Sequence, residues 1–559
     1  MAVASWLPRL RGPIDLRWDG GAYYVLGTAL AQGRGYRLLS EPGEIEAVQY
    51  PPLLPALVAV HQWALGTSDP MVVGQWLRLF FFVMFTAYVL TSYALLARLL
   101  PHGYAFAGVV VCLLHPFGMF LSDLLSAELP FALLAVLFAL FSGKPGSRGH
   151  PVLAGVCATL AYLVRTAGAA LLVAWVGDSL LRREFKRAAV RGAIALLPVL
   201  GWHAYVAEVQ SSVSYRTPAY PYQRADYLFY NVSYAANLSL RDPFRPELGR
   251  ASVLDLGRRF AVNVTRLPES LGEAVSAERF DWQNVLGRVP GAHEAAWGRG
   301  GHLLTTLVLV ALGSLVFSGI AIQLATPDRL IPLYVLAYMG AVCLTPWPLQ
   351  WKRYWWPLAP FLVLALLQGL LFLRGWAPAS RPARLVGRVL VPTVVGVVIV
   401  VESFTVSHAY RTIRGDAVLH DQRGEAAEFS RFFYRRPDRE LDEALEWLRG
   451  RARAGDVVAT AMPHWAHLIT GLKTVMPPFE SDPQRAQALL DAVPVRYVVM
   501  DSTDVDVAHL MRRVTGAVLR AEPSRWKQVY RGPSGLVVVY ERVAEAARDR
   551  TIDVAEPRR

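Results

Sequence analysis

The chain has 559 residues, of which 54% are hydrophobic and only 18% are charged, and its formal net charge is +13. Soluble domains carry about a quarter charged residues, so this composition excludes an ordinary soluble protein. The basic charge does not indicate a nucleic-acid partner, because no basic stripe with interleaved aromatic residues appears outside the predicted membrane loops. We therefore expect the lipid bilayer, and no nucleic acid, as a partner.

The chain begins with residues 1–73, which contain no run long enough to cross a bilayer and are expected to form a loop with amphipathic juxtamembrane helices. Apolar runs then recur, and a run of about 20 apolar residues spans the hydrocarbon core. We predict a polytopic α-helical membrane protein. The transmembrane helices are expected at residues 74–99, 103–121, 126–143, 151–164, 166–181, 188–208, 301–324, 329–347, 355–373 and 387–407. Within this pattern, residues 74–208 and 301–407 are membrane regions, 209–300 is a large loop and 408–559 is a tail.

Positive charges in the short loops predict the orientation, because Lys and Arg accumulate on the cytoplasmic side. One set of loops holds thirteen of them: Arg98, Lys144, Arg148, Arg182, Arg183, Lys186, Arg187, Arg191, Arg329, Arg374, Arg381, Arg384 and Arg388. The other set holds three, Arg165, Lys352 and Arg353. We therefore expect a multi-pass protein of the cytoplasmic (inner) membrane, with residues 1–73, 209–300 and the tail outside the cytoplasm.

This orientation has a consequence at the N-terminus. Residues 1–12 are too short to span the membrane, yet Asp19 should lie outside. We expect that a preceding transmembrane helix is missing from this sequence.

The tail is predicted to contain a small α/β domain at about residues 436–542, because helix-like and strand-like segments alternate there. The helices are expected at 442–449, 484–490 and 507–519, and the strands at 456–460, 495–501, 527–530 and 535–540. His464, His467 and Thr470 lie in one short segment. We expect solvent-facing or capping roles for them, because no third His or Cys completes a metal ligand set.

Three charged residues lie at the predicted outer membrane boundary, where charge is costly: Asp19, Glu128 and Arg353. Ionisable groups at such depth indicate a functional site by default. Two carboxylates suit a general base and an anchor for a metal or an acceptor, and a guanidinium suits a phosphate. The alternative for each residue alone is that it snorkels or caps a helix end. Both interpretations also apply to Arg78 and Arg165.

Short motifs follow one another in a characteristic order. They are Asp19-x-x-x-Tyr23-Tyr24, Gly33-x-Gly35-Tyr36, Tyr50-Pro51-Pro52-Leu53-Leu54-Pro55, Gln75-Trp76-Leu77-Arg78, Ser126-Ala127-Glu128-x-x-Phe131, Tyr162-Leu163-Val164-Arg165-Thr166 and Arg353-Tyr354. Set against the predicted topology, this order resembles the GT-C superfamily of lipid-linked-sugar glycosyltransferases. The resembling branch contains the dolichyl-phosphate-mannose protein mannosyltransferases and the aminoarabinose lipid A transferases. The resemblance covers nearly the whole chain.

The resemblance implies a GT-C fold and a sugar donor carried on a polyprenyl phosphate, with a cell-envelope lipid, glycan or protein as the acceptor. It implies that Asp19 is the catalytic carboxylate of the first external loop, with Asp15 as the fallback, and that Glu128 and then Asp123 match the second acidic position. The cations expected near the donor phosphate are Arg353, Lys352, Arg78 and Arg165. The tyrosines expected to form the substrate loop are Tyr23, Tyr24, Tyr50 and Tyr354.

The sequence departs from the pattern at two of these positions. Gly20 follows Asp19 where relatives often have Glu, and Tyr50 stands where some have Lys, which removes one candidate phosphate contact. No strong metal motif is present, although paired carboxylates could hold Mg²⁺ or Mn²⁺. Metal dependence, the sugar and the acceptor therefore stay open.

Two functions from other classes also fit a polytopic chain with charged membrane residues. One is a transporter or flippase of lipid-linked saccharides, and the other is a non-catalytic scaffold of the cell envelope. Transporters commonly show interrupted helices at corresponding positions of two halves, and this sequence shows no such pairing. The long loop and the tail favour an enzyme, so a glycosyltransferase is the leading hypothesis.

Overall fold

The computed structural model describes residues 6–143, 149–287, 294–375, 381–503 and 506–543, and for residues 294–299, 381–388 and 506–507 it describes the backbone alone. The chain divides into two compact units. One comprises Met1–Leu39, Gly43–Pro218 and Gln223–Arg435, and the other Ser40–Pro42, Ala219–Tyr222 and Arg436–Arg559. Of the charges used above for the orientation, Lys144 and Arg148 lie outside the described residues, as do the side chains of Arg381, Arg384 and Arg388.

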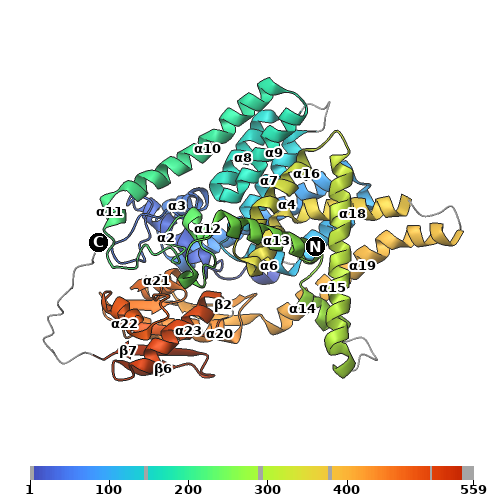
Figure 1. Ribbon diagram of the computed structural model, residues 1–559. Coiled ribbons are helices and arrows are strands. Elements are labelled where there is room, and N and C mark those ends of the chain that lie inside the picture. The colour runs from blue at the N-terminus through green and yellow to red at the C-terminus, as the bar shows by residue number, and fades with distance from the viewer. Residues whose placement is uncertain (1–5, 144–148, 288–293, 376–380, 504–505, 544–559) are drawn as a thin grey trace. The chain divides into compact units, whose positions relative to one another are not determined.

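The larger unit is built almost entirely of helices (Figure 1). Its first part contains α2 (Asp19–Ala31), α3 (Leu53–Leu65), α4 (Pro70–Leu99), α5 (His102–Leu114), α6 (Pro116–Asp123), α7 (Glu128–Ser142), α8 (Pro151–Val164), α9 (Ala169–Leu181) and α10 (Phe185–Ser211). The large loop contains α11 (Val213–Arg216), α12 (Tyr234–Ser239), α13 (Val253–Ala274) and α14 (Arg279–Leu286). The last part contains α15 (Glu294–Leu324), α16 (Leu330–Cys343), α17 (Trp351–Trp355), α18 (Ala359–Gly375) and α19 (Arg381–Thr412).

Five helical stretches of the described chain are long and apolar enough to cross a bilayer: Pro70–Leu99, Phe185–Ser211, Gly300–Leu324, Pro348–Gly375 and Val389–Thr412. Helices α5 and α6 would form a sixth, but they are bent by 59°. Shorter apolar helices occupy the remaining predicted spans, among them α7, α8 and α16. The prediction of a polytopic α-helical membrane protein is confirmed.

The bend between α5 and α6 corrects the expectation of one continuous helix at 103–121. Pro116 has no N–H to donate back into α5, so the first helix ends at Leu114. The side chain of His115 then accepts from the backbone N–H of Gly118 at 3.3 Å and caps the new helix. The break lets α6 turn and lead into the loop before Glu128.

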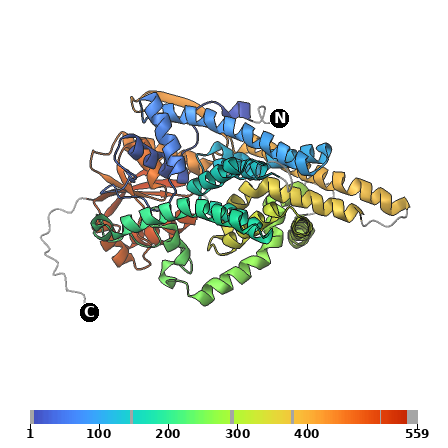
Figure 2. The same cartoon turned by 90° about the horizontal axis from the view of Figure 1, so that it is seen from above.

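Helices α13, α15 and α18 pack with their backbones in close contact. A Cβ at Gly313 of α15 would collide with the carbonyl oxygen of Pro268 in α13, and one at Gly319 with that of Ala365 in α18. Figure 2 shows α18 and α19, in yellow and orange, running alongside each other. After α19 the chain forms an antiparallel hairpin of β1 (Gly415–His420) and β2 (Ala426–Arg431), which the sequence analysis did not predict.

The smaller unit has a five-stranded mixed sheet in the order β4-β3-β5-β7-β6. Its elements are α20 (Arg436–Arg449), β3 (Val457–Thr460), α21 (Pro463–Thr470), β4 (Lys473–Val475), α22 (Pro483–Asp491), β5 (Val495–Asp501), α23 (Asp506–Ala521), β6 (Trp526–Arg531) and β7 (Val537–Arg542). Strand β3 pairs in parallel with β4 and β5, and β7 runs antiparallel to β5 and β6. The prediction of a C-terminal α/β domain is confirmed, with β4 as an additional strand.

Two segments from elsewhere in the chain complete this smaller unit. The carbonyl oxygen of Ser40 accepts from the N–H of Thr474 in β4 at 2.8 Å, and the Ser40 hydroxyl lies 2.8 Å from Nδ1 of His464. His464 is fully buried, so the expectation of a solvent-facing or capping role is wrong for it. His467 is partly buried, and its Nδ1 lies 2.7 Å from the carbonyl oxygen of Leu472, just beyond the end of the helix.

Candidate active site

Two loops of the larger unit are held together by backbone hydrogen bonds. The N–H of Asp15 donates to the carbonyl oxygen of Asp123 at 3.1 Å, and the N–H of Leu125 donates to that of Asp15 at 2.9 Å. Asp19 opens α2 shortly after the first of these segments, and Glu128 opens α7 shortly after the second. A carboxylate at a helix N-terminus interacts favourably with the helix dipole. The bridge therefore brings two such carboxylates into one region.

The chain enters α2 through an unusual backbone conformation at Trp18, with φ 53° and ψ −129°. A bulky residue rarely adopts a positive φ, and such strain persists only where the surroundings impose it. Here the buried Arg17 guanidinium donates to the Asp15 carboxylate at 2.6 Å and to the carbonyl oxygen of Phe433 at 2.6 Å. Burial disfavours the charged form of Asp15, but Arg17 and Arg431 outweigh it and lower the pKa of Asp15 to about 2. Asp15 is thus an anchor for the turn, and Asp19 is the carboxylate that the turn presents.

Arg353, in α17, bridges the two carboxylates. Its Nη2 donates to Oδ2 of Asp19, and its Nε donates to Oε1 of Glu128. Arg165, between α8 and α9, donates to the same oxygen of Glu128. We call Asp19, Glu128, Arg165 and Arg353 the charge quartet. It contains two formal negative and two formal positive charges, so it is balanced without any further ion.

The members of the charge quartet differ in how far they reach solvent. The Glu128 side chain is fully buried, whereas the side chains of Asp19, Arg165 and Arg353 are 13%, 16% and 25% exposed. Oε2 of Glu128 has no hydrogen-bond donor among the described residues. Asp19 and Arg353 therefore form the accessible side of the quartet, and Glu128 forms its base.

Tyrosines surround Asp19. The Tyr50 hydroxyl donates to Oδ1 of Asp19 at 2.9 Å, and the Tyr50 ring lies 4.7 Å from that of Tyr23 and 6.4 Å from that of Tyr230. Burial and the negative charge of Asp19 raise the pKa of Tyr50 and of Tyr230 well above the usual value of 10. Both hydroxyls therefore keep their protons and act as hydrogen-bond donors at neutral pH.

A second group of tyrosines lies on the Arg165 side of the quartet. The Arg165 guanidinium lies 5.1 Å from the centre of the Tyr354 ring, within the range of a cation–π interaction. The backbone of Tyr354 is held by Tyr338 of α16, whose hydroxyl donates to its carbonyl oxygen at 2.9 Å. Helix α16 thereby fixes the turn that carries Arg353.

Arg78 and Asp123 belong to a different network. Both are buried, Nη2 of Arg78 lies 3.4 Å from Oδ1 of Asp123, and Nη1 of Arg78 donates to the carbonyl oxygens of Arg9 and Arg11. The structure does not bring this pair to the charge quartet. Its contacts hold the N-terminal segment against α4 and α6, so we leave both residues out of the proposed site.

Lys352 and Tyr24, which were also predicted as site residues, make their contacts away from the charge quartet. Nζ of Lys352 lies 3.1 Å from Oε1 of Glu278, in a pair that is 42% and 36% exposed. The Tyr24 hydroxyl donates to the carbonyl oxygen of Ser68 at 2.9 Å, and the residue is fully buried. Tyr23, one position earlier on α2, is the member of the Tyr-Tyr pair that faces Tyr50.

The structure does not favour a metal at the paired carboxylates. No group of three or more His, Cys, Asp or Glu residues in the described ranges is arranged to hold a metal ion. Asp19 and Glu128 are instead bound by guanidinium groups, whose positive charge opposes a cation at the same oxygens. The residues present therefore do not fit the Mg²⁺ or Mn²⁺ considered from the sequence.

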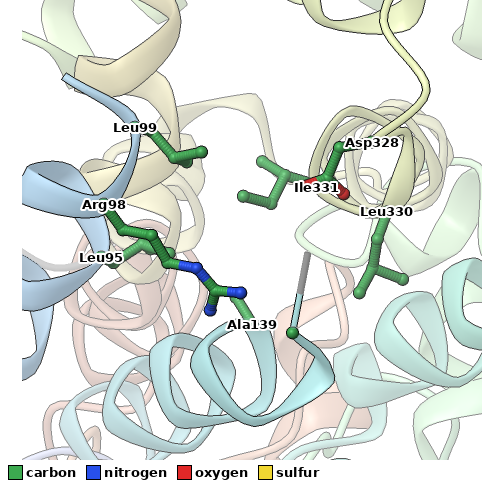
Figure 3. A pocket seen from close by; sticks show the side chains of 8 residues that line it. Leu95, Arg98, Leu99, Ala139, Asp328, Leu330 and Ile331 are labelled. Carbon is green, nitrogen blue, oxygen red and sulfur yellow. The ribbon is translucent and has the colours of Figure 1, made fainter. Parts of the chain in front are cut away.

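A small pocket lies far from this site (Figure 3). It is lined by Leu95, Arg98 and Leu99 of α4, Ala139 and Gly143 at the end of α7, and Asp328, Leu330 and Ile331 at the start of α16. Glu128 is at the opposite end of α7, about 20 Å away at 1.5 Å per helical residue. This pocket is not part of the candidate site.

Sequence reasoning missed Tyr230 and Tyr338. Tyr230 lies in the large loop, where many aromatic residues are present and none stands out by its spacing. Tyr338 lies inside an apolar helix, where a tyrosine is easily taken for a core residue. A polar hydroxyl within a predicted span is the signal that would have identified Tyr338.

No protein-family model and no curated protein matches the sequence. The structure does match solved structures. ArnT from Cupriavidus metallidurans bound to undecaprenyl phosphate is 14% identical, with a TM-score of 0.51 and 98% of each chain covered, and the apo form is 13% identical, with a TM-score of 0.52 and the same coverage. The Archaeoglobus fulgidus oligosaccharyltransferase, in complex with Zn and sulfate, is 14% identical, with a TM-score of 0.51 over 97% of this chain and 72% of that one. These are GT-C proteins, so the chain has the GT-C fold predicted from its sequence.

Proposed function

We propose that this protein is a glycosyltransferase of the cytoplasmic membrane. It transfers a sugar from a polyprenyl-phosphate-linked donor to a cell-envelope lipid, glycan or protein on the outer face. The observation that carries the proposal is the bridge of Arg353 between Asp19 and Glu128 in a chain with the GT-C fold. Two similar structures support it. One is ArnT bound to undecaprenyl phosphate, and the other is an oligosaccharyltransferase.

The proposed reaction is a single displacement at the anomeric carbon. The acceptor hydroxyl attacks C1 of the sugar, its proton passes to Asp19, the bond between C1 and the phosphate oxygen breaks, and polyprenyl phosphate leaves. Arg353 and Arg165 stabilise the charge that develops on the departing phosphate. One displacement inverts the anomeric configuration. No step requires a metal ion.

The remaining groups position the reactants. Oε2 of Glu128, which has no donor in the described part of the chain, can accept from a sugar hydroxyl. Tyr50 and Tyr230 offer donors and flat ring faces beside Asp19. The sugar is a hexose or a pentose.

The location of the site follows from the charge asymmetry of the short loops. Thirteen Lys and Arg residues in one set against three in the other support a position of Asp19, Glu128 and Arg353 outside the cytoplasm. The same count supports an extracytoplasmic tail. The donor's lipid tail would then reach the charge quartet from the outer leaflet of the bilayer.

The test is a transfer assay with the purified chain in proteoliposomes, supplied with polyprenyl-phosphate sugars labelled in the sugar. We expect label to reach an acceptor with the wild type and with Asp226→Asn, which changes a partly exposed carboxylate paired with Arg250. Asp19→Asn should reduce transfer by a factor of about 10² or more, as expected for loss of a general base. Full activity in Asp19→Asn would remove Asp19 from catalysis. No transfer from any donor by a folded wild type would favour a carrier or a scaffold.

A further inference from the structure

Asp19 is already engaged in the structure without substrate. Oδ1 accepts from Tyr50, and Oδ2 accepts from Arg353. Each oxygen of the Asp19 carboxylate therefore has a hydrogen-bond donor before any substrate is bound. The candidate base and the candidate phosphate ligand therefore neutralise each other.

We propose that the donor phosphate competes with Asp19 for Arg353, so that binding of the donor releases Asp19 to act on the acceptor. This inference rests on the function proposed above and adds an order of binding to it, with the donor first. Arg353 is the shared group, and the phosphate of the polyprenyl donor is its second anionic ligand.

The contacts indicate which carboxylate gives way. Glu128 is fully buried and is held by both Arg165 and Arg353, so removing its partners would leave an uncompensated charge in a low-dielectric environment. Asp19 has one guanidinium partner, is 13% exposed and lies on the accessible side of the quartet. A phosphate can also accept two parallel hydrogen bonds from a guanidinium, which makes it a strong competitor. Asp19 is the partner that Arg353 exchanges.

The transfer of Arg353 from Asp19 to the phosphate would also make the Asp19 carboxylate available to the acceptor. The quartet alone is neutral, and a phosphodiester adds one negative charge to it. After the exchange, Arg353 is neutralised by the phosphate, and Asp19 keeps its charge close to a second anion. The released Oδ2 of Asp19 can then accept a hydrogen bond from the acceptor hydroxyl and take its proton. Without donor, the paired Asp19 would leave acceptor hydroxyls and water unactivated.

The competition predicts that removing Asp19 strengthens binding of the lipid phosphate. The probe is undecaprenyl phosphate, which carries no sugar and permits no turnover, titrated into the purified full-length chain in nanodiscs. We expect Asp19→Asn to bind it about fivefold more tightly than the wild type, the effect of removing a competing, partly exposed ion pair. Asp226→Asn, which removes the same charge on the surface, should bind like the wild type, and Arg353→Gln should bind more weakly.

Tyr50 supplies a second test through a double-mutant cycle. Tyr50→Phe removes one of the tyrosine hydrogen bonds to Asp19, so Asp19 should hold Arg353 more firmly and weaken binding of undecaprenyl phosphate about twofold. In the Asp19→Asn background the same substitution should have no effect. An equal weakening in both backgrounds would mean that Tyr50 contacts the phosphate directly and would overturn the proposed coupling.

The outcomes separate this inference from the function on which it rests. Unchanged or weaker binding by a folded Asp19→Asn variant, with wild-type transfer intact, would overturn the competition alone. Absence of binding by every variant would overturn both the competition and the polyprenyl-phosphate donor. Tighter binding by Asp19→Asn together with lost transfer would support both.

Discussion

Glu128 is the member of the charge quartet whose loss should cost the most stability. It is fully buried and receives hydrogen bonds from two guanidinium groups. Glu128→Gln would leave both cations short of a counter-charge, and breaking a buried pair in this way costs about 3 kcal/mol of the free energy of unfolding. Thermal unfolding in detergent should show a clear drop in the midpoint.

Glu278→Gln is the matched control, because it removes the same charge from a partly exposed pair with Lys352. We expect a change below about 1 kcal/mol for that variant. Equal shifts of the unfolding midpoint in the two variants would mean that the buried bridge at Glu128 stabilises the protein no more than the partly exposed pair does.

The sequence predicted the four residues of the charge quartet because ionisable side chains at a membrane boundary are conspicuous. It did not predict which of them touch. Arg78 and Asp123 look similar in the sequence, yet they pair with each other, and Arg78 also donates to backbone carbonyl groups of the N-terminal segment. Lys352 adjoins Arg353, but successive helical residues face different directions, and it reaches Glu278 instead.

At the scale of the helix, the close contact between α13 and α15 predicts that a larger residue at Gly313 destabilises the protein. Gly313 packs against the carbonyl oxygen of Pro268, and any Cβ there would overlap it. Gly313→Ala should therefore force the helices apart and lower the free energy of unfolding by about 2 kcal/mol or more. Thermal unfolding of the purified protein would report the loss.

Gly340 provides the comparison within the same unit, because it lies in the middle of α16 and no atom lies near the position of a Cβ. Gly340→Ala should leave stability unchanged or raise it by about 0.5 kcal/mol, since Ala is the better helix former. If Gly313→Ala behaved in the same way, the tight contact with α13 would be contradicted.

The helices were largely predictable because each apolar run is long and bounded by Pro, Gly or charge. Their interruptions were not. The helix breaks before Pro116, where α5 ends and α6 begins, but the hydropathy pattern predicts one continuous span. The hairpin β1–β2 was missed because both strands are short and mix polar with apolar residues, and periodicity does not reveal which segments pair.

At the scale of the whole molecule, the smaller unit draws on three separate parts of the sequence. Ser40 contacts His464 across 424 positions of the chain, and the contact buries the imidazole. No local pattern predicts such a contact, so the sequence alone predicts a solvent-facing or capping role for His464. Burial lowers the pKa of His464 to about 3, with His467 adding to the effect.

This shift predicts an acid sensitivity of the smaller unit. Between the ordinary pKa of 6.5 and about 3, the unfolded state binds a proton that the folded state does not, so stability falls as the pH falls. Between pH 6.5 and 5 the loss should be about 2 kcal/mol, at about 1.4 kcal/mol per pH unit. Amide hydrogen exchange in the strands around Thr474, measured on the full chain at both pH values, would detect it.

Replacing the imidazole should remove this part of the pH dependence. In His464→Gln, the loss of protection between pH 6.5 and 5 should be smaller than in the wild type, whatever the cost of the substitution itself. His509→Gln, at an exposed position on α23, should keep the wild-type dependence. An unchanged slope in His464→Gln would assign the acid sensitivity to other groups.

The activity proposed for the charge quartet is the removal of a sugar from a lipid phosphate. The most direct test uses one polyprenyl-phosphate sugar labelled differently in the sugar and in the lipid, given to the purified chain in proteoliposomes. We predict that the wild type separates the two labels and releases free polyprenyl phosphate in an amount equal to the sugar transferred, and that Asp19→Asn does neither. Two labels that cross the bilayer together, or that remain joined in the presence of every acceptor offered, would contradict this activity.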